Sequence, residues 1–122
     1  MAFKSFEELD VWKRGCRLAV DVSRSLSGSK QFALKDQIQR AAISIPSNIA
    51  EGHECDSRLD FIRFLRMSKG SAAELRTQCY IGLKLEMLSK GDAERFIQES
   101  KELSAMLQGL NRAISPKPKT EN

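Results

Sequence analysis

The clearest periodic pattern in this 122-residue chain lies in residues 57–90, SRLDFIRFLRMSKGSAAELRTQCYIGLKLEMLSK. Apolar or small side chains recur there at alternating spacings of 4 and 3 residues, at Phe61, Leu65, Ser68, Ala72, Leu75, Cys79 and Gly82. This heptad period is typical of a helix that packs along its length against other helices. The sequence therefore predicts one long helix that begins after a cap at Ser57 and closes at Gly91-Asp92, where the next helix begins.

Helical stripes also run through the segments on both sides. A first helix, opening with the capping box Ser5-Phe6-Glu7-Glu8, carries Leu9, Trp12, Cys16, Ala19, Val22 and Leu26. A second helix carries Leu34, Ile38, Ala41, Ile45 and Ile49. Pro46 should kink or split it, and Gly52 should end it. The last helix carries Phe96, Ser100, Leu103, Leu107, Leu110 and Ile114.

Four amphipathic helices joined by short connections predict an all-α fold, an antiparallel up-down four-helix bundle with a proline-kinked second helix. The bundle should occupy residues 1–114, and residues 115–122, SPKPKTEN, should form a disordered tail because they hold no apolar anchor. With 41% hydrophobic and 30% charged residues, the chain fits one globular domain.

Localisation is constrained by three features of the composition. No apolar run is long enough for a transmembrane helix, and the N-terminus lacks a basic-then-apolar signal segment. The cysteines, Cys16, Cys55 and Cys79, lie far apart and are odd in number, which is typical of reduced thiols. We expect a cytoplasmic protein that does not bind a membrane.

Several sequence segments occur together in a characteristic order and spacing. They are LDVWK at residues 9–13, QIQRAAISIPSNIAEG at residues 37–52, and FIRFLR with GSAAEL at residues 61–66 and 70–75. In that order, they closely resemble the bacterial 23S rRNA intervening-sequence protein family, also called the four-helix bundle protein family. The resemblance covers about residues 3–113, and its most specific element is the stretch from Arg40 to Gly52.

The resemblance implies a four-helix bundle that assembles into a ring-like homopentamer. Such proteins are encoded in segments inserted within large-subunit ribosomal RNA genes, and many others stand alone in bacterial genomes. A related protein, the accessory variability determinant of diversity-generating retroelements, is a basic pentamer that binds nucleic acid and a reverse transcriptase. No enzymatic activity or cofactor is attached to the family, and the function of most members is unknown.

The net charge of +4 is concentrated in one part of the chain. Residues 1–57 hold eight basic and eight acidic side chains, and residues 91–122 hold five of each. Residues 58–90 hold seven basic and three acidic side chains, a difference of four that accounts for the whole excess. The third helix and its end therefore carry the net charge.

Five of these cations share an arc of about 80° at 100° per residue, namely Arg58, Arg66, Lys69, Arg76 and Lys84. The stripe is about 40 Å long and could follow the phosphate backbone of RNA or DNA. The aromatic interleaving typical of single-strand binders is poor, because Tyr80 is the one aromatic residue that joins the stripe. The alternative is a solvated helix face whose charges pair with acids of neighbouring helices or subunits.

A second arc of the same helix carries large apolar side chains, Leu59, Met67, Ile81, Leu85 and Leu88. One apolar face suffices for the bundle core, so a second face predicts an oligomer interface. The alternative is a wide face turned toward the core. Trp12 should lie in the core or at a subunit boundary. A protein-interaction scaffold that binds no nucleic acid is the alternative function.

The motif of the second helix, Arg40, Pro46, Asn48, Glu51 and Gly52, admits two interpretations. Asn48 and Glu51 are the residue types that bind a ligand or polarise a water. The structural interpretation, which we favour, is that Ser47 or Asn48 satisfies backbone groups freed by Pro46. Glu51 would then pair with Arg40 or with a base of the third helix.

Catalytic and metal-binding patterns are weak. His53-Glu54-Cys55 would contribute two zinc ligands where three or four are needed, and His53 is the single histidine. Ser27-Gly28-Ser29-Lys30 matches Ser-x-x-Lys by chance, without the partner motifs of that enzyme class. We find no glycine-rich phosphate loop. The sequence therefore predicts no enzyme, no metal site and no cofactor.

Overall fold

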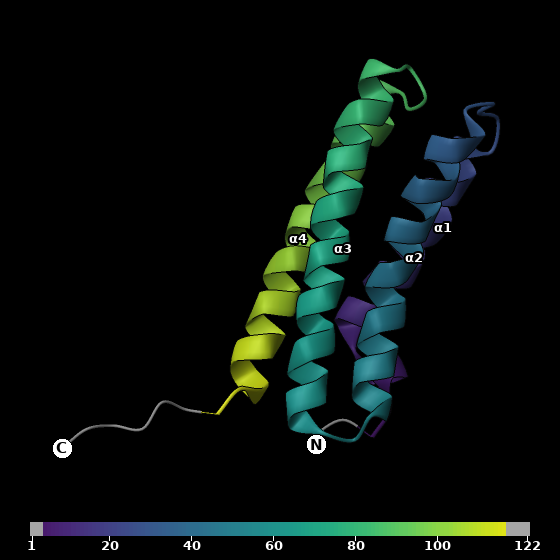
Figure 1. Ribbon diagram of the computed structural model, residues 1–122. Coiled ribbons are helices and arrows are strands. Elements are labelled where there is room, and N and C mark those ends of the chain that lie inside the picture. Colours follow the sequence, from purple (N-terminus) through teal and green to yellow (C-terminus); the bar gives the residue numbers. More distant parts are fainter. Residues whose placement is uncertain (1–3, 117–122) are drawn as a thin grey trace.

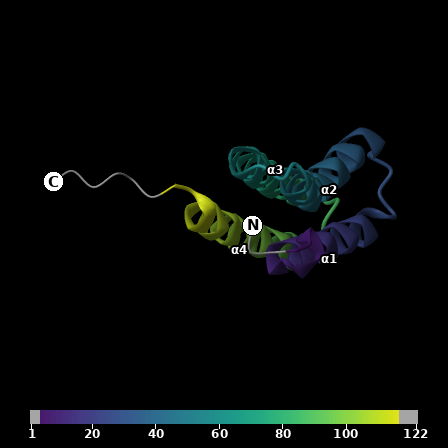
Figure 2. The ribbon, with the colours of Figure 1, turned by 90° about the horizontal axis from the view of Figure 1, so that it is seen from below.

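The computed structural model describes residues 4–116, which form four α-helices preceded by a short 3-10 turn. The turn η1 spans Phe6–Glu8, and the helices are α1 (Asp10–Leu26), α2 (Phe32–Glu54), α3 (Arg58–Lys84) and α4 (Lys90–Ile114). Successive helices run up and down side by side (Figure 1). Viewed from below, they occupy four corners, with α1 diagonally opposite α3 (Figure 2). The predicted all-α four-helix bundle is confirmed.

The core follows the predicted periodicity of α3 and α4. All seven positions of the predicted α3 seam are buried, from Phe61 to Gly82. On α4, Phe96, Ser100, Leu103 and Leu107 are buried as well. Helix α3 begins as expected, because the Ser57 hydroxyl accepts the N–H of Asp60 at 3.3 Å. The heptad spacing thus identified the inward face correctly.

Helix α1 begins later than the capping box at Ser5 predicted. The Ser5 hydroxyl accepts the N–H of Glu7 at 3.1 Å and caps the turn η1 instead. Leu9 follows in extended conformation and is buried, so α1 begins at Asp10. Phe6 in the turn packs edge-on against Trp12, with ring centroids 5.2 Å apart.

Helix α2 runs unbroken through Pro46 and past Gly52 to Glu54. The predicted stop at Gly52 is wrong, because this glycine serves a close contact between helices. A Cβ at Gly52 would lie 2.6 Å from the Cβ of Phe64 on α3, which is shorter than any normal contact. Pro46 is buried against α1, where a Cβ on Gly15 would lie 3.3 Å from its Cδ.

Helix α3 ends at Lys84, before the predicted end at Gly91-Asp92. Glu86 adopts a left-handed backbone (φ 58°), and the N–H of Met87 donates to the carbonyl of Gly82 at 2.8 Å. This reversal turns Leu88 into the core. The cap of α4 is Ser89, whose hydroxyl accepts the N–H of Asp92 at 3.1 Å, so Gly91 lies inside the first turn of α4.

Helix α4 ends at Ile114. The sequence predicts disorder for residues 115–122. Of these, residues 117–122 lie outside the described part of the chain. Within residues 4–116, no helix is both long and apolar enough to cross a bilayer.

Candidate nucleic-acid interface

The five predicted basic residues of α3 lie at the surface. Arg58, Arg66, Lys69 and Lys84 are exposed, and Arg76 is half-buried. The stripe runs beside α4, because the Nζ of Lys69 donates to the Oε1 of Gln108 at 2.8 Å. Near the start of α3, the Nδ2 of Asn111 donates to the carbonyl of Ile62 at 3.2 Å. These two bonds fix the antiparallel register of α3 and α4.

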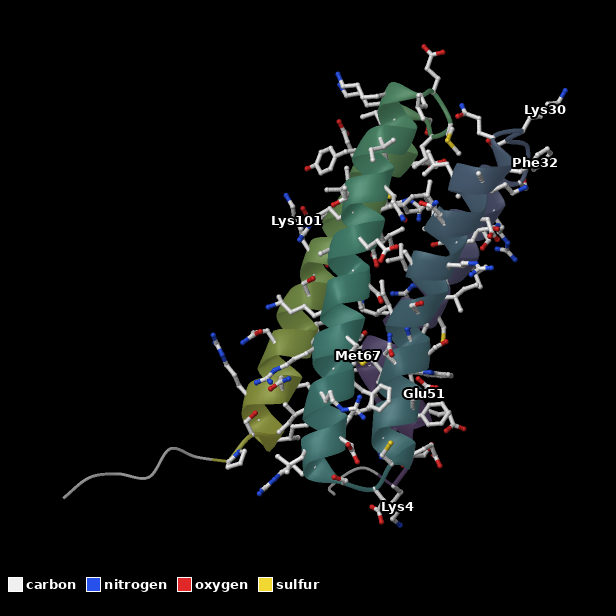
Figure 3. All side chains as sticks on the ribbon, viewed as in Figure 1. Lys4, Lys30, Phe32, Glu51, Met67 and Lys101 are labelled. Atoms are coloured by element: carbon white, nitrogen blue, oxygen red, sulfur yellow. The ribbon has the colours of Figure 1, made fainter. Side chains whose placement is uncertain are left out.

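Helix α4 adds two cations that the sequence reasoning missed. Lys101 and Arg112 lie about 20° and 40° around the helix from Gln108, so both lie near the edge of α4 that faces α3. Both are exposed, and Lys101 projects outward beside α3 (Figure 3). A helical projection of α4 centred on Gln108 would have found them. Counting net charge by segment hid them, because α4 also contains acids.

We call these seven side chains the cationic seam: Arg58, Arg66, Lys69, Arg76, Lys84, Lys101 and Arg112. Among residues 4–116, no carboxylate lies within salt-bridge distance of any of them. Pairing of the stripe with acids of neighbouring helices is therefore absent from the described part of this chain. A solvated face, or pairing with acids of another subunit, stays the alternative.

Two acids of α4 are turned away from the cationic seam, toward α1. The Nη2 of Arg14 lies 2.9 Å from the Oε1 of Glu102 and 3.3 Å from the Oε1 of Glu99. The hydrogen bond from Arg14, with a second from Gln98, lowers the pKa of Glu102, and the bond to Glu102 raises the pKa of Arg14. A third acid, Glu94, pairs with Lys90 at 3.9 Å.

The one tyrosine of the chain stands within the cationic seam. Tyr80 is 52% exposed. It lies one helical turn from Arg76 on one side and one turn from Lys84 on the other. The seam therefore combines positive charge with one accessible aromatic ring, and cations and aromatic rings are the two groups that bind nucleic-acid backbones and bases.

The predicted apolar arc on α3 is exposed at four of its five positions. We call Leu59, Met67, Ile81 and Leu85 the α3 apolar ridge, and each is at least 45% exposed. Leu88 does not belong to the ridge, because the chain reverses after Lys84 and buries it beside Gly82.

A second apolar surface, which the sequence reasoning missed, lies between α1 and α2. It is a hollow of about 450 Å³ lined by apolar side chains that include Trp12, Val20, Ile43 and Ala50. Val20 and Ile43 are each about half exposed. Trp12, expected in the core or at a subunit boundary, is half-buried in this hollow. We call this surface the α1–α2 groove.

The residues of the second-helix motif make several local contacts. The Nδ2 of Asn48 donates to the carbonyl of Ser44 at 2.9 Å, one turn back on its own helix. The carbonyl that Pro46 leaves without its helical donor is that of Ala42, four residues before the proline, so this bond is not the predicted one. The predicted pair of Glu51 with Arg40 is wrong, because about three helical turns, or 16 Å, separate them. Arg40 pairs with Asp36 at 3.2 Å instead, and Glu51 is exposed on the outer side of α2 (Figure 3).

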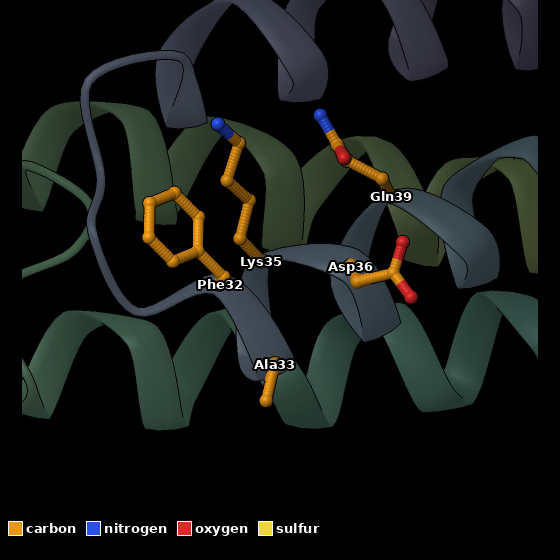
Figure 4. Close-up of a pocket in the computed structure, with 5 residues that line it drawn as sticks. All are labelled: Phe32, Ala33, Lys35, Asp36 and Gln39. Atoms are coloured by element: carbon orange, nitrogen blue, oxygen red, sulfur yellow. The ribbon is translucent and has the colours of Figure 1, made fainter.

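A shallow hollow of about 440 Å³ lies at the start of α2 (Figure 4). Its charged groups are engaged locally. The Nζ of Lys35 lies 6.0 Å from the ring centroid of Phe32 and donates to the carbonyl of Ser27 at 3.3 Å. Asp36 is held by Arg40. The hollow therefore brings together no acid and base that are free to act on a substrate.

The histidine and the thiols lie in different environments. His53 is buried and packs edge-on against Phe61, with ring centroids 5.8 Å apart. Cys55 is exposed at the end of α2. Burial raises the pKa of Cys79 to about 12, so this thiol stays protonated at neutral pH. Residues 4–116 contain no group of three or more potential metal ligands among His, Cys, Asp and Glu.

The fold and its surfaces define a small four-helix-bundle protein with one cationic and two apolar outer surfaces. The chain belongs to the 23S rRNA-intervening sequence protein family, whose sequence profile matches residues 7–109. It is similar to the crystal structure of a protein with unknown function from the S23 ribosomal protein family of Bacteroides thetaiotaomicron, with 25% sequence identity and a TM-score of 0.77. That similarity covers 84% of this chain and 98% of the other. No curated protein matches the chain significantly.

Proposed function

We propose that this protein is a non-catalytic four-helix bundle that binds RNA or DNA through the cationic seam. The observation that carries the proposal is the separation of charge on α3 and α4. Seven cations without carboxylate partners in the described chain gather along these helices, while Glu99 and Glu102 face α1. A row of unpaired cations about 40 Å long matches a polyanion, because each phosphate contact releases condensed counterions.

The family membership supports the same proposal without specifying it. The family's name refers to segments within ribosomal RNA genes. The resemblance to the accessory variability determinant of diversity-generating retroelements, a basic pentamer that binds nucleic acid, points in the same direction. Both considerations concern relatives, so the proposal depends on the seam itself.

The test compares two variants with the same change in net charge. Reversing Arg66, Lys69 and Lys84 to Glu should weaken binding to a labelled RNA or DNA strand by at least about tenfold, because cations that release counterions are replaced by groups that repel phosphate. Reversing the exposed α1 residues Lys13, Arg17 and Arg24 to Glu is the control. Equal losses in both variants would show that only total charge matters and would overturn the proposal.

A second candidate function, a protein-interaction scaffold, is favoured by the two apolar surfaces. The α3 apolar ridge and the α1–α2 groove lie on different helices and are made of different residues. A contact between two such surfaces on neighbouring copies is heterologous, and it closes into a ring when the rotation between copies permits. We propose that the chain forms a homo-oligomer, a pentamer, by this contact.

Light scattering tests the oligomer directly. The wild-type protein should have a mass close to five times that of the 13.7 kDa chain. Replacing Met67 and Ile81 of the ridge by Glu should release monomers that keep their helical circular dichroism, because both side chains are already about half exposed. A wild-type mass of one chain would exclude the ring.

A further inference from the structure

We infer that the cationic seam recognises an unpaired strand, and that the ring of Tyr80 stacks on one of its bases. This inference rests on the proposed nucleic-acid binding and specifies which form of nucleic acid the seam selects. A purely electrostatic seam would accept duplexes and single strands alike. The presence of one exposed aromatic ring among the cations distinguishes the two cases.

The position of Tyr80 makes its ring accessible from solvent. The side chain is 52% exposed. Arg76 and Lys84 lie four residues before and after it, which places each about 6 Å along the helix and about 40° to either side. The ring therefore stands between two cations, neither of which forms a salt bridge within the described chain.

Helix α4 extends this arrangement on the other side. Counting eleven residues along both antiparallel helices from the Lys69–Gln108 bond places Tyr80 opposite Ile97. Ile97 is 8% exposed, and Lys101 follows it by one turn. Glu94, one turn the other way, is held by Lys90 at 3.9 Å. The surroundings of the ring thus favour a flat apolar base whose phosphates face cations.

The chemistry of stacking selects unpaired bases. In a duplex, the faces of each base are covered by its neighbours, so an exposed side chain meets only edges and backbone. In a single strand, a base can turn outward and lay its face on an aromatic ring, whatever its sequence. The cations would then hold the neighbouring phosphates. The inferred ligand is a single strand without strong sequence preference.

The test measures binding of a fluorescent oligothymidylate and of the same strand paired with oligoadenylate. The wild type should prefer the single strand. Tyr80→Ala should weaken single-strand binding about fivefold or more, as expected for a lost stack, and leave duplex binding and the salt dependence unchanged. Tyr80→Phe should keep the affinity. Phe32→Ala, which removes an exposed aromatic ring at the start of α2 outside the seam and outside both apolar surfaces, is the matched control.

Photo-crosslinking gives a second readout that a merely structural role would not produce. A strand carrying 5-bromouracil should crosslink at Tyr80, and the site is unambiguous for a tyrosine because the chain has one. If charge reversal in the seam weakens binding but Tyr80→Ala does not, the stacking inference is wrong and the seam remains. If the wild type binds neither probe, both the inference and the proposed function are overturned.

Discussion

Helix α3 packs differently against its two neighbours, α2 and α4. Toward α2, the contact is close and buried. Gly52 leaves no room for a Cβ beside Phe64, and the Ser68 hydroxyl donates to the Ile45 carbonyl at 2.8 Å in a fully buried position. Toward α4, the outer edge is bridged by long polar side chains such as Lys69 and Gln108. One flank thus fixes the helix, and the other presents its charge to solvent.

This difference separates the residues that identify the family from the residues that carry the proposed function. The most specific resemblance to the family lies in the stretch from Arg40 to Gly52. Residues of this stretch make contacts inside the bundle: Asn48 donates a hydrogen bond to its own helix, and Gly52 packs against Phe64. The cations of the seam lie outside that stretch. Changes on the α2 flank should therefore alter stability, and changes on the α4 flank should alter binding.

The largest expected effect on the α2 flank comes from Gly52→Ala. The new methyl group would lie 2.6 Å from the Cβ of Phe64, an atom that moves only with its backbone, so α2 and α3 must separate. We expect a loss of about 1–3 kcal/mol in the free energy of unfolding, as for other overpacked cores. Urea denaturation followed by circular dichroism measures it.

Gly70→Ala is the control for that variant. Gly70 lies mid-helix in α3, and nothing lies within 4 Å of a Cβ placed there. Alanine should stabilise the helix by up to about 1 kcal/mol, since glycine is the poorer helix former. Equal effects of the same sign at Gly52 and Gly70 would contradict the close contact between α2 and α3.

A smaller effect on the same flank should follow from Ser68→Ala. This change removes the buried hydrogen bond to the Ile45 carbonyl and should cost about 1 kcal/mol of unfolding free energy. Thr77→Ala, which removes an exposed bond within α3, should be within about 0.5 kcal/mol of the wild type. Nucleic-acid affinity should stay unchanged in both. If Ser68→Ala is fully folded but binds nucleic acid more weakly, the assignment of stability to the α2 flank and of binding to the α4 flank is contradicted.

The smallest stability effect should appear in acid, at the contact between α1 and α4. Because Arg14 and Gln98 lower the pKa of Glu102, its ionised form stabilises the fold above the usual glutamate pKa of 4.5, and that contribution disappears as the pH falls through the lowered value. Glu102→Gln should therefore flatten the pH dependence of unfolding below pH 4.5 and leave the neutral range less stable. If Glu102→Gln leaves the pH dependence of unfolding below pH 4.5 unchanged, the ion pair between Arg14 and Glu102 contributes nothing to stability.

The fold could be predicted from the sequence because the heptad spacing of α3, from Phe61 to Gly82, identifies the residues that it buries. The sequence was insufficient where the backbone leaves the helix. The left-handed Glu86 ends α3 early and turns Leu88 inward, and no glycine or proline marks that reversal. A helical projection continued past Lys84 therefore placed Leu88 on the wrong surface.

The sequence predicted the cations that lie on α3. It did not predict the parts of the surface that two helices form together. The stripe on α3 depends only on the helical repeat. Lys101 and Arg112 join it because of the way α4 is rotated, which Gln108 and Asn111 reveal by bonding to α3. The α1–α2 groove likewise depends on how Val20 and Ile43 face each other across two helices. Relative rotation of packed helices is set by side-chain fit, which spacing alone does not encode.

The salt dependence of nucleic-acid binding tests the central claim most directly. For a single strand, the logarithm of the affinity should fall with the logarithm of the salt concentration by about 0.7 per phosphate contacted, to a limit near 5 for seven cations. Replacing Arg66, Arg76 and Lys101 by Gln should reduce that slope by about 2 and leave the unfolding free energy nearly unchanged. A slope near zero in the wild type, or the same slope in the variant, would contradict a binding surface on the cationic seam.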